Sequence, residues 1–385
     1  MAQANTPSQP KNFGFGDEEK MLRDSARKFF ADNSTADVVH KLVAGNPDPN
    51  REVRVAWDES LWRQITELGW TAAAVPERAG GMGMPAVAVA ALAEESGRAA
   101  YVGPLLPTLC SSLVLSCCNT AEADQYLARI VEGASMTLAI ANGQREWCYQ
   151  DSPVTVSEGK LNGTVPFVQD LQKCDLFLVS AKNAAGELEL YVVSKDAQGV
   201  SFLADAIVDL TRDQGRLVLQ DVAVEPSHKV SALPADTILY SAEPMLITLV
   251  AADIAGAAEW QLQTTTEYAK TREQFGRPIG FFQAVKHPLV DMMVMIDQTR
   301  GHVYNAACAW DHEPENVAQY AHMAKASAGE TAVFCSNRSV QLHGGIGFTW
   351  ECYLHIYFKR QMHNQMLFGD ATWHRAKLAG ILIEM

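Results

Sequence analysis

The hydrophobic period of the chain changes twice, and this change limits the folds that the sequence can adopt. In the first third, Leu22, Ala26, Phe29 and Phe30 recur at the spacing of one helix face. In the middle, short β-rich runs such as 188–193 are separated by Gly, Asn and Asp turn signals. From about residue 235 the helical period returns and continues to the end.

This order predicts an α+β fold in which a β domain interrupts two helical ones. Strands that follow one another without intervening helices favour a small antiparallel barrel or sandwich. A length of 385 residues fits two or three packed units. We therefore expect an N-terminal α-helical domain at 1–134, a middle antiparallel β-barrel or β-sandwich domain at 135–233, and a C-terminal α-helical bundle at 234–385.

The composition excludes several classes of protein. Lys and Arg number 31 against 45 Asp and Glu, and the resulting net charge of −14 argues against a nucleic-acid partner. The sequence has no run of 18 uninterrupted apolar residues and a polar N-terminus, so neither a membrane span nor a secretory signal is predicted. The 8 cysteines form no CxxC pair, which predicts reduced thiols in a cytoplasmic protein without a metal site.

Two segments of the C-terminal part carry chemistry. The first runs from Tyr268 to His287, where Arg272 closes a helix and can form charge-assisted bonds to an anion. In the second, Gln341 to Phe348, the glycines let backbone N–H groups approach a ligand. Together they indicate a site for a dinucleotide-like anion. Either segment alone also fits a purely structural role. The first would then be a turn with a surface ion pair, and the second a glycine stretch that ends a helix.

These segments resemble the acyl-CoA dehydrogenase family of flavoproteins, and the resemblance covers nearly the whole chain. Landmarks that are similar to the family's also occur earlier, at 61–62, 68–70, 75–83, 94–98 and 209–212. The resemblance implies an N-terminal α-domain, a middle β-domain, a C-terminal four-helix bundle and, usually, a tetramer. It also implies an FAD cofactor, an acyl-CoA substrate, and electron-transfer flavoprotein or a similar electron acceptor.

The family's reaction removes an α-proton with a carboxylate while the β-hydride passes to the flavin, giving a trans-2-enoyl-CoA. Donors that polarise the thioester carbonyl make the α-proton acidic. In the family, two C-terminal segments of one subunit hold the pyrophosphate and adenine end of the neighbouring subunit's FAD. By position, the resemblance assigns this role to Arg272, Gln274, Phe275, Gln283, Gln341, Gly344 and Gly345.

The position of the family's usual catalytic glutamate is altered in this chain. Phe368 occupies it, and the alternative position on the preceding helix lines up near Leu246. The nearest carboxylate is Asp370, two residues further on. Asp370 is interpreted either as a displaced catalytic base or as the N-cap of the last helix, and the two roles are compatible.

The β-domain departs from the family pattern too. The segment 141–147 replaces the family's Thr-Glu-Pro…Gly-Ser-Asp run, and Phe167-Val168-Gln169 replaces the tripeptide that lies against the flavin ring. Phe167 still offers a ring, and Gln169 offers a donor. The residues that would serve a neighbour's FAD are therefore intact, whereas those that would serve the chain's own FAD are altered.

This asymmetry favours an acyl-CoA dehydrogenase that works as one subunit of a heterotetramer, although a homotetramer remains open. Two other hypotheses are a non-catalytic partner subunit that completes another chain's site, and a flavoprotein of this fold with a different reaction. The family branch that pairs unlike subunits hints at bulky acyl groups, such as those of steroid degradation. An esterase is disfavoured because the sequence has no Gly-x-Ser-x-Gly elbow.

Overall fold

The computed structural model describes residues 9–44, 56–142 and 147–383. The chain forms two compact units, each assembled from separate stretches of sequence. We call the first the helical unit, which comprises Met1–His40, Pro85–Tyr101 and Ile247–Met385. The second, the sheet unit, comprises Lys41–Met84 and Val102–Leu246. The three domain boundaries expected from the sequence stay a prediction.

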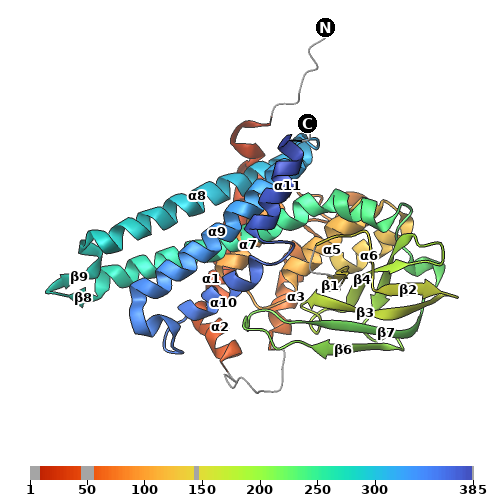
Figure 1. The fold of residues 1–385 in the computed structure, drawn as a ribbon, viewed down its shortest axis with the longest axis horizontal. Helices are drawn as coiled ribbons and strands as arrows, with labels where there is room; N and C mark the ends of the chain where they lie inside the picture. Colours follow the sequence, from red (N-terminus) through yellow and green to blue (C-terminus); the bar gives the residue numbers. More distant parts are fainter. Residues whose placement is uncertain (1–8, 45–55, 143–146, 384–385) are drawn as a thin grey trace, which may run out of the picture. The chain divides into compact units, whose positions relative to one another are not determined.

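The helical unit is built from long helices, of which α8 and α9 run side by side (Figure 1). α10 and α11 pack on α9, and α1 packs on α4. The helices wholly or largely in this unit are α1 (Asp17–Asn33), α2 (Ala36–Val43), α4 (Ala86–Arg98), α7 (Ala235–Thr271), α8 (Gln283–His312), α9 (Val317–His343), α10 (Leu354–Asn364) and α11 (Ala371–Ile383). Helix α7 begins in the sheet unit and continues into the helical unit.

Within the helical unit, α4 and α7 cross with their backbones in direct contact. A Cβ atom on Gly97 of α4 would lie 2.1 Å from the carbonyl oxygen of Asp253, and one on Gly256 of α7 would lie 1.9 Å from that of Glu94. Each helix therefore presents a glycine to the backbone of the other. Only a residue without a side chain allows this approach.

Buried ion pairs join the other helices to this crossing. Arg360 of α10 is fully buried, and its Nε and Nη2 atoms donate to the carboxylate of Asp253 at 3.0 and 2.7 Å. Arg300 of α8 donates to Glu94 of α4 at 2.8 Å. A bidentate Arg–carboxylate pair fixes orientation as well as distance. Because a buried charge is costly without its partner, these pairs set how α8 and α10 lie on α4 and α7.

The sheet unit contains a seven-stranded sheet of order β1-β4-β2-β3-β7-β6, with β5 paired to β4. Its strands are β1 (Met136–Ala139), β2 (Val154–Ser157), β3 (Lys160–Gln169), β4 (Leu176–Lys182), β5 (Leu188–Ser194), β6 (Val200–Ala204) and β7 (Gln214–Ala223). Helices of this unit are α3 (Glu59–Glu67), α5 (Leu105–Cys118) and α6 (Ala121–Val131). The buried core of the sheet includes Val165, Leu171, Phe177, Val193 and Leu217.

The expected helical, β and helical order is confirmed, with one correction to the sheet. The sheet is mixed, because β1 pairs with β4 in parallel and β2 meets β4 in parallel at one position. The other pairs are antiparallel. Strands β2 and β3 intervene in the sequence between β1 and β4, and such a crossover lets two strands run in the same direction. Strands that follow one another without helices favour antiparallel pairs between sequence neighbours, but this rule does not apply to β1 and β4, which are not neighbours in the sequence.

Helix α7 is long and apolar enough to span a membrane by length and composition. However, 89% of its most apolar window is buried inside the protein. Apolar residues around the whole circumference are typical of a core helix as well as of a membrane span. The burial of α7 identifies it as a core helix.

We predict that Gly256→Ala destabilises the protein by about 1–3 kcal/mol or more, because the new methyl group must push the backbones of α7 and α4 apart. The control is Gly301→Ala on α8, where a Cβ meets nothing within 4 Å. There alanine should gain roughly 0.5–1 kcal/mol in helix propensity. Urea unfolding of both variants checks this, and equal stability of the two would show that the crossing is not tight.

Candidate functional site

The segment that contains Arg272 forms an exposed hairpin at the end of α7. Strand β8 (Glu273–Gln274) pairs with β9 (Arg277–Pro278). Phe275 and Gly276 make the turn with φ angles of 54° and 76°. Glycine adopts this region freely, whereas phenylalanine does so at a cost. The side chain of Phe275 is 89% exposed, and Arg272, Gln274 and Gln283 are exposed as well.

The glycine segment follows α9 directly. Gly344 ends the helix with a φ of 65°, and the next residues form a short 3-10 helix, η6 (Gly344–Phe348). A Cβ atom on Gly344 or Gly345 would meet nothing within 4 Å. Gln341, on the last turn of α9, is exposed too. The backbone at Gly344 and Gly345 is therefore open to the approach of a ligand, and the exposed amide of Gln341 lies on the helical turn before it.

A stacked pair of rings brings these two segments together. Tyr268 lies one helical turn before Arg272, and its ring stacks on His343 at 4.3 Å between centroids. The Tyr268 hydroxyl also donates to the carbonyl oxygen of His343 at 3.4 Å. Because His343 directly precedes Gly344, the stack joins the end of α7 to the end of α9. The two segments singled out in the sequence are neighbours in the structure.

Asp370 begins α11 and caps it. Its Oδ1 atom accepts a hydrogen bond from the backbone N–H of Trp373 at 2.8 Å, and its carbonyl accepts from His374. These contacts confirm the N-cap interpretation. A carboxylate has a second oxygen, so capping leaves Asp370 able to take a proton. Its role as a catalytic base stays a prediction.

The turn before Asp370 has a constrained backbone. Phe368, which the resemblance aligns with the family's glutamate, is only 9% exposed and has a φ of 57°. Gly369 has a φ of 106°, and a Cβ there would lie 2.6 Å from the ring of Trp373. The phenylalanine therefore fills the position with a buried apolar ring.

Three buried titratable side chains lie against this turn. Lys325 of α9 donates to the carbonyl oxygens of Gln365 and Gly369 at 2.9 and 2.8 Å. The Nδ1 atoms of His322 and His374 lie 2.8 Å apart and share a hydrogen bond. Burial lowers the pKa of Lys325 to about 7 and that of His322 to about 4, and it also lowers the pKa of His374.

This group was not expected from the sequence. Lys325 stands among small residues on a helix face that has no charged pattern, and no histidine or carboxylate lies one helical turn from His322. The nearest signal is Lys325 itself, because a lysine flanked by Ala321, Ala324 and Ala328 lies on a face that becomes fully buried. A lysine buried in this way needs partners.

Asp370 also lines a pocket of about 650 Å³ within the helical unit. Side chains from α8, α9 and the start of α11 surround it, including Arg338 and Glu330 of α9 and Thr372 of α11. Arg338 lies over the ring of Phe334, and Glu330 pairs with Arg375. The lining of the pocket thus includes the carboxylates of Asp370 and Glu330 and the guanidinium of Arg338.

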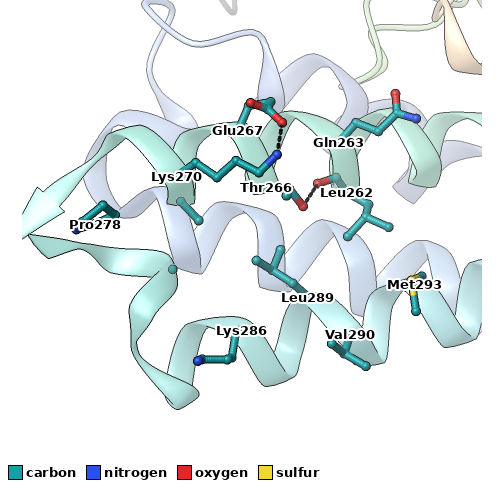
Figure 2. A pocket seen from close by; sticks show the side chains of 12 residues that line it. Leu262, Gln263, Thr266, Glu267, Lys270, Pro278, Lys286, Leu289, Val290 and Met293 are labelled. Carbon is teal, nitrogen blue, oxygen red and sulfur yellow. Dashed lines mark hydrogen bonds and ion pairs between the residues drawn. The ribbon is translucent and has the colours of Figure 1, made fainter.

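A second groove, of about 660 Å³, runs between α7 and α8 (Figure 2). Leu262 and Leu289 line it, together with the half-exposed Val290 and Met293. Figure 2 shows an ion pair of Lys270 with Glu267 at its edge. Pro278, at the end of the hairpin, also lines it.

Phe167 and Gln169 lie in the sheet unit, at the end of β3. The register of β3 on β7 shifts between Val165 and Val168, and Phe167 in this irregularity has a φ of 57° and is 50% exposed. Gln169 donates to Gln214 at 2.8 Å. The irregularity turns the Phe167 ring outward, where a ligand can contact it. Of the altered segment 141–147, residues 143–146 lie outside the described residues.

Across residues 9–44, 56–142 and 147–383, no group of three or more His, Cys, Asp or Glu side chains is placed to hold a metal ion. Three histidines at intervals of ten lie on two different helices: His302 and His312 are on α8, and His322 is on α9. The donors gathered at the site are amides, backbone N–H groups and a guanidinium, and these bind anions.

We predict that the free energy of unfolding falls as the pH drops from about 6.5 to 4, by about 1.4 kcal/mol per pH unit for each buried histidine. In this pH window the two histidines become protonated in the unfolded chain, whereas His322 and His374 stay neutral in the folded protein because burial lowers their pKa values. A double variant, His322→Leu with His374→Leu, removes both side chains of the shared hydrogen bond and should make this dependence shallower, with the remainder coming from other buried histidines such as His355. Urea unfolding at several pH values checks it, and His312→Gln serves as control. The same steepness in the double variant would contradict the prediction.

Comparison with known proteins identifies the family. Residues 16–134 match the model of the acyl-CoA dehydrogenase N-terminal domain, and residues 248–382 match that of the C-terminal domain. The acyl-CoA dehydrogenase IpdE2 of Mycobacterium tuberculosis is 32% identical over 345 residues, which cover 89% of this chain and 91% of IpdE2. The acyl-CoA dehydrogenase FadE28 of the same organism is 27% identical over 325 residues, with 83% and 91% coverage.

Solved structures agree in fold. A variant of the steroid ACAD Tcur3481–Tcur3483 is 29% identical with a TM-score of 0.83, covering 95% of this chain and 98% of that one. The ChsE4–ChsE5 complex of Mycobacterium tuberculosis is 24% identical with a TM-score of 0.85, covering 97% and 99%. These matches confirm the family and the enzyme class that the motifs predicted. The chain belongs to the acyl-CoA dehydrogenase family of flavoprotein oxidoreductases.

Proposed function

We propose that this chain is one subunit of an FAD-dependent acyl-CoA dehydrogenase that desaturates an acyl-CoA thioester between its α- and β-carbons. The observation that carries the proposal is an asymmetry. The segments that would hold a neighbour's cofactor are intact and exposed, whereas the position of the usual base holds the buried Phe368. A heterotetramer with a second, unlike subunit of the family accounts for both features.

The donors of the helical unit fit a dinucleotide. Open space at Gly344 and Gly345 leaves room for a phosphate against the backbone, and the guanidinium of Arg272 supplies the opposite charge. When bound, the flavin accepts the β-hydride of the substrate. The residues proposed to hold FAD from this side are Arg272, Gln274, Phe275, Gln283, Gln341, Gly344 and Gly345.

The residues proposed to face the chain's own flavin are Phe167 and Gln169. The exposed ring of Phe167 offers an apolar surface, and Gln169 would donate to the flavin by giving up one of the two hydrogen bonds that its amide makes within this chain. Gln169 already donates to Gln214 and to the carbonyl of Phe167. The amide is therefore held in place beside the ring.

Asp370 is the carboxylate proposed to remove the α-proton if this chain carries the base. Its backbone position is fixed by the cap on α11, and it opens into a pocket that could admit a thioester. A second candidate function, a non-catalytic partner subunit, is favoured by the buried Phe368, since a partner's carboxylate would then act instead.

The apolar groove of Figure 2 supports assembly with another subunit. Val290 is 52% exposed and Met293 47%, and Phe275 of the hairpin that follows α7 is exposed as well. Exposed apolar strips of this kind mark protein interfaces. The partner we propose is a second acyl-CoA dehydrogenase-like chain, in a cytoplasmic enzyme.

A steroid-derived thioester is the proposed substrate class, because the 29% identical Tcur3481–Tcur3483 is described as a steroid ACAD. Electron-transfer flavoprotein or a similar protein is the proposed acceptor. The 24% identical CarC of Acetobacterium woodii is a subunit of a caffeyl-CoA reductase–Etf complex. Both assignments rest on these relatives.

We predict that acyl-CoA thioesters bleach the flavin of the co-expressed complex under anaerobic conditions, and that Asp370→Asn slows bleaching by about 10²–10⁴-fold, the usual contribution of a general base. Asparagine still caps a helix, so the melting temperature should stay the same. Unchanged bleaching in Asp370→Asn would assign the base to the partner. Absence of bleaching with every thioester in a panel would refute dehydrogenation.

We predict that Arg272→Gln lowers the flavin content of the purified complex, because it removes the charge that would neutralise the pyrophosphate. The matched control is Arg277→Gln, an exposed arginine of the same hairpin that lies 4.1 Å over the ring of Phe281. The ratio of flavin absorbance to protein measures occupancy. Full occupancy in Arg272→Gln would show that Arg272 does not hold the cofactor.

A further inference from the structure

The turn between α10 and α11 is held from outside by a buried lysine. The Nζ atom of Lys325 donates to Gln365 at the start of the turn and to Gly369 at its end. The two carbonyls are four residues apart, so one ammonium group hydrogen-bonds both ends of the turn. We call this pair of hydrogen bonds the clasp. The exposed fraction of Lys325 is 0%.

This contact is not needed to build α9. Lys325 lies in the middle of the helix, where backbone hydrogen bonds are already complete. An apolar side chain of the same length would fill the same space without the cost of burying an amine. That cost is visible in the pKa of Lys325, which burial lowers to about 7. What the ammonium supplies is the pair of hydrogen bonds to the turn.

A second contact holds the far side of the turn. His322, one helical turn before Lys325 on α9, shares its hydrogen bond with His374 of α11. The backbone N–H of His374 donates to the carbonyl of Asp370. Residues 322 and 325 therefore fix the two ends of the segment that carries Asp370. The charged and titratable groups around Lys325 are Asp370 on the turn, His322 on its own helix, and His374 on α11.

We propose that Lys325 is a positioning residue for the proposed reaction: by closing the 365–369 turn on α9, it fixes the carboxylate of Asp370 in the lining of its pocket. The proposal rests on the proposed function for its catalytic part alone. The mechanical part, a turn held rigid by Lys325, stands on the hydrogen bonds of the helical unit.

Lys325→Met tests the mechanical part without activity. Methionine replaces the apolar stem of lysine with an unbranched side chain one atom shorter, and it donates no hydrogen bond. Amide hydrogen exchange across 366–374 should speed up by at least about tenfold, the change expected when hydrogen bonds worth about 1.4 kcal/mol are lost. The control is Ser336→Ala, which removes a buried hydrogen bond of α9 to Gln261 away from the turn. It should leave exchange across 366–374 unchanged.

Steady-state kinetics of the co-expressed complex test the catalytic part of the proposal. A base that is mispositioned slows the chemical step, so Lys325→Met should lower kcat by roughly 10- to 100-fold and leave KM within about twofold. A role in stability alone would lower the active fraction in both Lys325→Met and Ser336→Ala. Equal kcat per bound flavin in Lys325→Met and the unaltered enzyme would overturn positioning.

The unaltered protein gives the deciding measurement if Lys325→Met does not fold. A clasped turn predicts that the amides of Leu367 and Gly369 exchange about as slowly as those in the middle of α9. Exchange at the rate of an open peptide would overturn the clasp. A protected turn in an enzyme that bleaches with no thioester would leave the clasp intact and refute the proposed function.

Discussion

The helical unit depends on the point where α4 and α7 cross without side chains between them. Gly97 and Gly256 each meet the backbone of the opposite helix, and the carbonyl that Gly97 meets belongs to Asp253. The carboxylate of this same residue accepts both nitrogens of the buried Arg360. The crossing thereby sets the position of α10, and α10 leads directly into the turn that carries Asp370.

The C-terminal ends of α7 and α9 carry the residues of the candidate cofactor site. The stack of Tyr268 on His343 places the Arg272 hairpin beside the glycines that follow α9. All the donors of this side belong to one unit and are exposed. A site that is well formed yet open to solvent is suited to a ligand shared with another subunit, and this is the physical basis of the proposed heteromer.

Much of the fold could be predicted because periodicity reports burial. The helical, β and helical order follows from it, and the motifs at 272–276 and 341–345 identified the family. The direction of β1 relative to β4 could not be predicted, because β4 is buried along nearly its whole length and a continuous apolar run does not report the direction of its neighbours. The cap formed by Asp370 was anticipated, since Asp before a helix is typical of an N-cap.

The group around Lys325 could not be predicted from the sequence. Lys325 donates to the carbonyl oxygens of residues 365 and 369. Every residue has a backbone carbonyl, so the pattern of side chains does not indicate which carbonyls accept. The partner of His322 lies 52 residues away, on a different helix. Such contacts become visible only when the packing of α9 against the turn is known, and they surround the turn that carries Asp370.

The central claim is that this chain completes its site with an unlike subunit. Native mass spectrometry of the chain, purified alone and after co-expression with a second chain of the family, tests it most directly. We expect the chain alone to lack stoichiometric flavin and the co-expressed sample to be a tetramer of both chains that retains FAD. A flavin-loaded homotetramer of this chain alone, active on an acyl-CoA thioester, would contradict the claim.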